Sequence, residues 1–147
     1  MTTEHNKLIV RRIFEELVSK GDMSVADELF ASNFLWSQFG LHGPEGVKQW
    51  VRAFRSAFPD VHDTVEEQIA EGDKVMSRVL VKGTNLGEWY GMPPTGKSAV
   101  WSAVGIDRLV DGKIVERYAI FDLAGVLQQL GHENLELKHL GQDFKSE

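Results

Sequence analysis

The sequence predicts an α+β domain in which helices cover one face of a curved β-sheet. Three N-terminal segments carry apolar residues at helical spacing, and four later segments alternate between apolar and polar residues as strands do. Short turns and one loop join these strands, so that they can pair antiparallel without crossover helices. At 147 residues the chain can build one core around a small-molecule pocket. We therefore expect one domain, residues 1–131, followed by a polar tail, residues 132–147.

The helices are predicted from apolar stripes and from residues typical of helix ends. The first spans residues 6–20, and its stripe consists of Leu8, Ile9, Ile13, Phe14, Leu17 and Val18. Gly21 follows it as a C-terminal stop. A second helix begins at residues 22–24, where Asp22 or Ser24 can cap it. The third begins at Gly43 with a proline in its first turn and ends before Pro59.

The strands follow from period-two alternation and from the turns between them. A short strand is predicted at residues 33–38. The four longer ones are Val61–Ala70, Lys74–Thr84, Ser98–Val110 and Ile114–Asp122. The turns at residues 71–73 and 111–113 each contain a glycine beside aspartate, which is typical of hairpins. A loop spans residues 86–97, and a closing helix, Leu123–Leu130, ends at Gly131.

Composition argues against several classes of partner and cofactor. The formal charge is −6 with acidic and basic residues mixed along the chain, which disfavours nucleic acid and anionic membranes. No apolar run approaches the length that spans a bilayer. The chain has no cysteine, which fits a cytoplasmic location, and its five histidines show no metal-ligand spacing. We expect neither a metal nor a nucleotide cofactor.

The last strand supplies the strongest catalytic candidate. Alternation places Glu116, Tyr118, Ile120 and Asp122 on one face, which we expect to be buried. A carboxylate there is costly unless it is paired, protonated or used in chemistry. Asp122 also immediately precedes the closing helix, where aspartate is a favoured N-cap. A catalytic role and a capping role both remain open.

Several segments, in the same order along roughly residues 6–131, carry a shared pattern: Leu29-Phe30-Ala31-Ser32-Asn33-Phe34, Gly43-Pro44-Glu45-Gly46-Val47, Phe58-Pro59-Asp60, Pro93-Pro94-Thr95-Gly96-Lys97, Asp111-Gly112-Lys113-Ile114-Val115-Glu116 and Gln128-Gln129-Leu130-Gly131. With these segments the chain resembles the SnoaL-like polyketide cyclase family, within the superfamily of cone-shaped α+β domains that includes nuclear transport factor 2. The resemblance implies a cone-shaped sheet, antiparallel or mixed, wrapped around three N-terminal helices.

The resemblance also implies a chemistry. Family cyclases close a ring by intramolecular aldol condensation without metal or organic cofactor, and an aspartate at the end of the last long strand is their general acid/base. Asp122 matches that position. The chain departs from the family where a histidine is common, having Trp36-Ser37-Gln38 in the early strand and Asn85 after the Gly83-Thr84 pair, and it has Tyr118 where a tryptophan is usual.

Other residues are candidates for contact with a ligand. Trp36, Trp50 and Trp89 are expected as pocket walls, and Phe54 either as a wall or as core. Tyr118, Gln38 and Asn85 could hydrogen-bond a substrate carbonyl, although strand-edge and loop polarity explains the two amides equally well. Arg78 could bind an enolate or carboxylate, or form a surface ion pair.

Asp107 is a second acid whose surroundings the sequence leaves open. Alternation groups it with Trp101, Ala103 and Gly105, but which face lines the pocket is undetermined. A surface or interface salt bridge is the favoured role, because aspartate is usually exposed. If Asp107 faces inward, two carboxylates would suggest water activation, as in relatives that hydrolyse limonene epoxide.

The function predicted from these features is cofactor-free general acid/base catalysis on an apolar, carbonyl-bearing small molecule, by aldol-type cyclisation or isomerisation. The alternatives are epoxide hydrolysis by an activated water and a non-catalytic domain that binds a hydrophobic ligand. The outer face of such a sheet commonly pairs with a second copy, and a homodimer is therefore expected.

Overall fold

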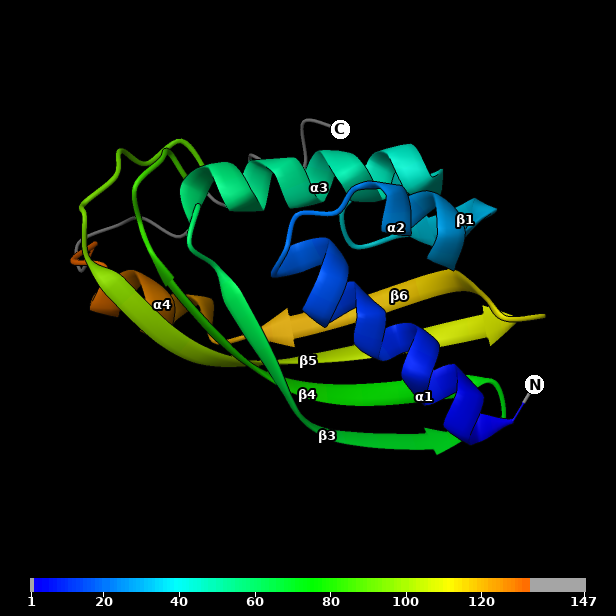
Figure 1. The fold of residues 1–147 in the computed structure, drawn as a ribbon. Helices are drawn as coiled ribbons and strands as arrows, with labels where there is room; N and C mark the ends of the chain where they lie inside the picture. Colours follow the sequence, from blue (N-terminus) through cyan, green and yellow to red (C-terminus); the bar gives the residue numbers. More distant parts are fainter. Residues whose placement is uncertain (1, 133–147) are drawn as a thin grey trace.

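A six-stranded sheet curves around the N-terminal helices, with the longest helix lying across the open side (Figure 1). A computed structural model of the chain describes residues 2–132. Its helical segments are α1 (Thr3–Arg12), η1 (Ile13–Val18), α2 (Ser24–Leu29), α3 (Gly43–Ala57) and α4 (Leu123–Gln129). Its strands are β1 (Phe30–Trp36), β2 (Leu41–His42), β3 (His62–Glu71), β4 (Lys74–Thr84), β5 (Ser98–Val110) and β6 (Lys113–Phe121). The predicted α+β class is confirmed, whereas the predicted tail beyond His132 lies outside the described residues.

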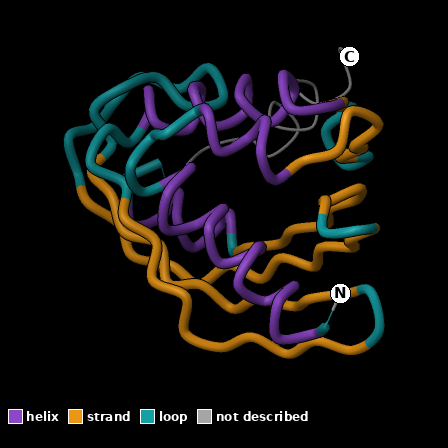
Figure 2. The backbone as a smooth tube through the Cα atoms, turned by 45° about the vertical axis from the view of Figure 1, so that its right-hand side comes forward, coloured by secondary structure: helices purple, strands orange, loops and turns teal. Residues whose placement is uncertain are grey.

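The sheet has the order β2-β1-β6-β5-β4-β3, and β1 pairs with β6 in parallel while the other neighbours are antiparallel. The tube view shows the long strands bending together beneath α1 and α3 (Figure 2). Local turn chemistry sets the hairpin between β5 and β6, because Asp111 and Gly112 have φ of 50° and 77°. The four long strands predicted from alternation are therefore present, with ends that differ by one residue at most.

Several predicted boundaries are wrong, including the start of the first helix, which lies at Thr3 rather than residue 6. The first helix is not uniform: after Arg12 it widens into the π-helical turn η1, where the Ser19 N–H donates to the Phe14 carbonyl oxygen. β1 begins at Phe30 rather than residue 33. It ends at Trp36, because residues 37–40 turn back, with Gly40 at φ 65°, into the unpredicted strand β2.

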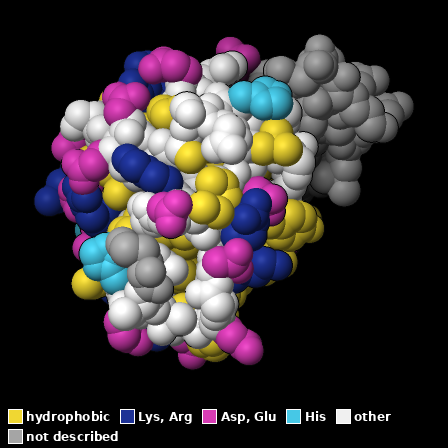
Figure 3. All heavy atoms as spheres, turned by 90° about the vertical axis from the view of Figure 1, so that its right-hand side faces the viewer, with side chains coloured by type: hydrophobic (Ala, Val, Ile, Leu, Met, Phe, Trp, Pro, Cys, Tyr) yellow, Lys and Arg dark blue, Asp and Glu magenta, His cyan; other side chains and the backbone are white. Residues whose placement is uncertain are grey.

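The two faces of the sheet differ in character. The inner face packs against the helices around a core that includes Phe34, Phe58 and Leu17. The outer face exposes apolar side chains on paired strands, among them Ile106 and its register partner Tyr118. Pairing of two copies through this face stays a prediction. On the side drawn in Figure 3, acidic and basic side chains are interspersed. Within residues 2–132, no helix has the length and apolar character needed to cross a membrane.

Candidate active site

A cavity of about 520 Å³ lies between the helices and the concave face of the sheet. Aromatic rings from three directions form much of its wall. Trp36 of β1 lies 5.1 Å from Trp50 of α3, and Trp50 stacks on Phe54 at 5.2 Å between ring centroids. Trp89 reaches the cavity from the loop before β5. All four predicted aromatic contacts therefore lie on the wall, and their use by a substrate remains to be tested.

The floor of the cavity comes from the opposite face of β6 to the one expected. Arg117, Ala119 and Phe121 line the cavity, whereas Glu116 and Tyr118 point outward and Tyr118 is 52% exposed. Ile120, which belongs to the outward group and is 53% exposed, also borders the cavity. Alternation grouped these residues correctly, but the choice of buried face was wrong. Tyr118 consequently lies outside the pocket. On this inner face Arg117 finds a partner on β5, which local sequence does not reveal.

That partner is Asp107, which sits directly across from Arg117 in the register of β5 and β6. The Arg117 Nη1 atom lies 2.8 and 2.7 Å from the two carboxylate oxygens, and Asp107 is 0% exposed. Burial raises the pKa of Asp107, while the bonded guanidinium opposes that rise. The favoured expectation of an exposed salt bridge was therefore wrong, because a buried aspartate is tolerated when a charged partner satisfies it.

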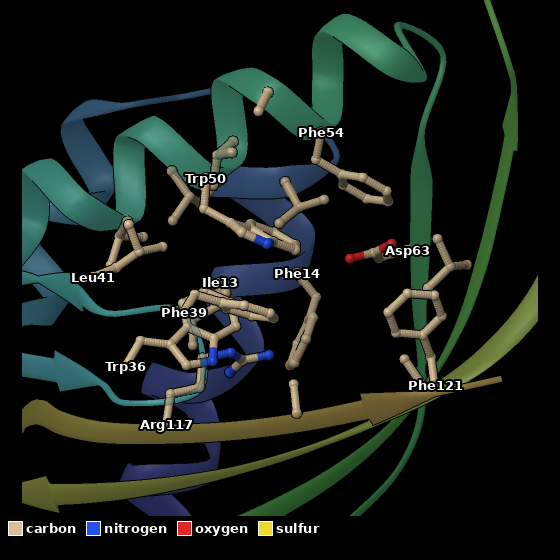
Figure 4. A pocket seen from close by; sticks show the side chains of 18 of the residues that line it. Ile13, Phe14, Trp36, Phe39, Leu41, Trp50, Phe54, Asp63, Arg117 and Phe121 are labelled. Atoms are coloured by element: carbon tan, nitrogen blue, oxygen red, sulfur yellow. The ribbon is translucent and has the colours of Figure 1, made fainter. Parts of the chain in front are cut away.

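Asp63 is the acid that the sequence reading missed. It lies near the start of β3 and is 7% exposed, and its Oδ1 atom has no hydrogen-bond partner among the described residues. Burial raises the pKa of Asp63 to about 7, with Arg117 opposing the rise. Figure 4 shows Asp63 directed into the same cavity as Arg117. The available signal was alternation, since Val61, Asp63 and Val65 share the inner face of this strand.

Asp122 lies outside this cavity. It is exposed, and its Oδ1 atom accepts a hydrogen bond from the Gly125 N–H at 2.9 Å as the N-cap of α4. The cavity is lined by the two residues before it, Ile120 and Phe121. The capping interpretation is therefore confirmed, whereas the expected burial of Asp122 is wrong. Its catalytic role stays a prediction.

Gln38 acts as a framework residue beside the cavity. Its amide nitrogen donates to the Ala119 carbonyl oxygen at 2.8 Å, and its amide oxygen accepts from the Ala119 N–H at 2.7 Å. The same oxygen accepts from the Trp36 indole nitrogen at 3.2 Å. These bonds hold Trp36 against β6, and they occupy the groups that were expected to bind a substrate carbonyl.

Asn85 and Arg78 are also engaged away from the cavity. The buried Asn85 amide donates to the Gly87 carbonyl oxygen at 2.9 Å and accepts from the Thr95 N–H at 3.1 Å. It thus fixes the loop that carries Trp89. Arg78 forms a surface ion pair with Glu66 at 2.8 Å, so its expected contact with an enolate or carboxylate is not supported by its position.

The raised pKa of Asp63 predicts a pH-dependent cost to stability. Because its pKa in the fold lies above the ordinary aspartate value of 3.8, the folded protein binds this proton more tightly than the unfolded chain does. The stabilisation is complete below about pH 4 and is lost as the pH rises to about 7. Asp63→Asn should remove that loss, making the variant more stable relative to wild type at pH 8 than at pH 4, by roughly 2 to 4 kcal/mol. Urea unfolding across this range measures it.

Asp60→Asn is the matched control for that measurement. Hydrogen bonds from the Thr84 N–H and hydroxyl lower the pKa of Asp60, so its stabilising effect is present at neutral pH and lost on acidification. Replacing it should therefore give the opposite pH trend. If the free energy of unfolding changes with pH in the same way in wild type and Asp63→Asn, the burial of an unpaired Asp63 carboxyl is contradicted.

Comparisons with known proteins give a consistent assignment. The family model described as SnoaL-like polyketide cyclase matches residues 8–130. The nogalonic acid methyl ester cyclase of Streptomyces nogalater is 34% identical over 96 residues, which are 64% of this chain and 72% of that protein. The aklanonic acid methyl ester cyclase DnrD of Streptomyces peucetius is 32% identical over 92 residues, covering 62% of this chain and 63% of DnrD.

A solved structure supports the fold independently. TsrD from Streptomyces laurentii superposes with a TM-score of 0.83, covering 89% of this chain and 98% of TsrD. At 22% sequence identity this likeness concerns the fold alone. The predicted arrangement of a curved sheet around N-terminal helices is therefore confirmed by comparison as well as by the topology described above.

Proposed function

Since the chain belongs to the SnoaL-like polyketide cyclase family, we propose that it closes a ring in a polyketide-type substrate, with Asp63 as the general acid/base. The observation that carries this assignment is a buried carboxyl without a hydrogen-bond partner for Oδ1, directed into an aromatic cavity. An unpaired carboxylate would only weaken a site built to bind an apolar ligand. Its presence therefore favours an enzyme over a passive binding domain.

The proposed reaction needs only proton transfers and one new carbon–carbon bond. The Asp63 carboxylate removes a proton from a carbon next to a carbonyl group. The resulting enolate carbon attacks a second carbonyl carbon of the same molecule, and the new alkoxide takes the proton back from Asp63. A pKa of about 7 suits both steps, because acid and base forms are then similarly populated at neutral pH. No redox cofactor is required by this balance.

The geometry of the charged residues argues against epoxide hydrolysis by an activated water, although Asp63 lies in the same cavity as Arg117, the partner of Asp107. Water activation of that kind needs a second carboxyl group to protonate the opening epoxide. Asp107 does not line the cavity, and both of its oxygens accept hydrogen bonds from Arg117. Glu88 also lines the cavity, but it is exposed on the loop before β5. Asp63 is thus left as the buried acid/base among the described lining residues, which suits cyclisation or isomerisation.

The wild-type protein is expected to convert nogalonic acid methyl ester or aklanonic acid methyl ester, the compounds named for the two relatives, into a cyclised isomer of unchanged mass. Liquid chromatography with mass detection follows the conversion, and NMR assigns the new ring. Ala103→Leu, which adds bulk on the cavity side of β5, should slow it, whereas Ser102→Leu adds the same bulk on the exposed face. If neither ester is converted, the proposal of polyketide cyclisation fails.

A further inference from the structure

Asp107 engages only one of the three guanidinium nitrogens of Arg117. Nη1 makes both hydrogen bonds to Asp107, while Nε and Nη2 have no hydrogen-bond partner among the described residues. The Arg117 side chain is only 8% exposed, yet it lines the cavity. An arginine cannot lose its charge in a protein, and its free N–H groups form a planar fork suited to an oxyanion.

The surroundings hold this guanidinium in one place. Its central carbon lies 5.3 Å from the ring centroids of both Phe14 and Trp36. Gly105 provides the space beneath it, because a Cβ atom there would lie 2.9 Å from Nη2. Hydrogen-bond donors that are already held in position lose little conformational freedom when a ligand binds. Their electrostatic effect is also strong in a site shielded from water.

Charge in the cavity also favours an anion beside Arg117. Asp107 is hidden behind the guanidinium, so the charge that faces the cavity at this point is positive. Among the described residues, the other carboxyl groups that line the cavity are Asp63 on β3 and Glu88, which is exposed on the loop before β5. When Asp63 is protonated, Arg117 is the charged residue that remains among the buried residues lining the cavity.

We infer that the Nε–Nη2 edge of Arg117 is an oxyanion site, which binds the enolate oxygen of the substrate while Asp63 holds the proton removed from carbon. The inference deepens the function proposed above and rests on it. It restricts the substrate class to compounds with an acidic carbonyl or enol group at the end that enters the cavity. Asp107 is then a positioning residue, since it touches Arg117 and not the ligand.

Binding of two coumarins tests this site without any turnover. 7-Hydroxycoumarin ionises to a planar oxyanion, whereas 7-methoxycoumarin has nearly the same shape and stays neutral. Both are titrated by fluorescence at alkaline pH into the Asp63→Asn protein, whose amide cannot repel an anion. The anion is expected to bind at least about tenfold more tightly than the methoxy compound, as an opposite charge within contact distance predicts.

The preference should disappear when the charge pair is replaced by apolar residues. In the Asp63→Asn protein that also carries Arg117→Met and Asp107→Leu, the anion should bind no better than 7-methoxycoumarin, whose own affinity should change little. Buried ion pairs often tolerate such paired replacement. Should that variant not fold, Arg117→Lys in the Asp63→Asn protein keeps a charge for Asp107 but lacks the free edge, and it should also lose the preference.

Equal affinity for the two coumarins in Asp63→Asn, or a preference that survives loss of the arginine, would overturn the inference. The result of the coumarin-binding test can be distinguished from the result of the cyclisation test of the proposed function. An anion preference together with failure to cyclise either ester would refute only the proposed reaction, and cyclisation without the preference would refute only the oxyanion site.

Discussion

Asp63→Asn is expected to lower kcat/KM for ring closure by about 10²- to 10⁴-fold, the usual contribution of a positioned general acid/base. Asparagine preserves the size and shape of the side chain but can neither accept the proton from carbon nor return it. Because asparagine places no buried charge in the fold, the variant is expected to fold at least as well as wild type at neutral pH. Steady-state kinetics with whichever methyl ester the wild type converts measures the loss per folded molecule.

Asp122→Asn is the matched control, because it makes the same chemical change at the other candidate carboxyl. Asparagine is also a good N-cap, so α4 should persist and turnover should stay close to that of wild type. The reverse pattern, with Asp122→Asn inactive and Asp63→Asn active, would return the acid/base role to the position that the family resemblance implies. The two variants therefore decide between a buried carboxyl in the cavity and an exposed one at its edge.

Asp107→Ala is expected to reduce the free energy of unfolding by about 3 to 5 kcal/mol. Removing the carboxylate leaves the Arg117 charge buried between Phe14 and Trp36 without its ion-pair partner. Water would have to reach the guanidinium, or the side chain would have to leave the inner face of β6. Urea unfolding at neutral pH, followed by tryptophan fluorescence, measures the change.

The next register pair on the same two strands provides the control. Arg108 and Glu116 form an ion pair at 2.7 Å, but they lie on the exposed outer face. Glu116→Ala should therefore change stability little, because solvent already screens exposed pairs. Equal effects of the two substitutions would mean that Asp107 and Arg117 are not shielded from water.

Patterns among neighbouring residues were sufficient to predict most of the secondary structure. The long strands β3 to β6 were predicted within a residue at each end, because period-two alternation and the turns at Gly72 and Gly112 are properties of neighbouring residues. The strand β2 was missed because two residues carry no periodicity. The π-helical turn η1 was missed because its residues continue an ordinary helical stripe.

The site was only partly predictable for a related reason. Large aromatic residues such as Trp36 and Trp50 lie on the cavity wall because they are apolar on elements that face the core. The charged residues depend on partners far along the chain: Arg117 faces inward with Asp107 opposite, and the pKa of Asp63 depends on how completely the helices bury it. Asp122 was predicted as the catalytic acid rather than Asp63 because its neighbours and its match to the family position can be read from the sequence. Its exposure to solvent cannot be read from the sequence.

The sequence by itself determined the α+β class, the order of the elements and which residues share a face of each strand, because these follow from spacing along the chain. It also placed Asp122 at a helix start. Only the tertiary structure decided which face of β6 lines the cavity, and with it the identity of the buried charges. Alternation fixes two faces but not which one loses contact with water; that choice is made by packing between segments distant in sequence.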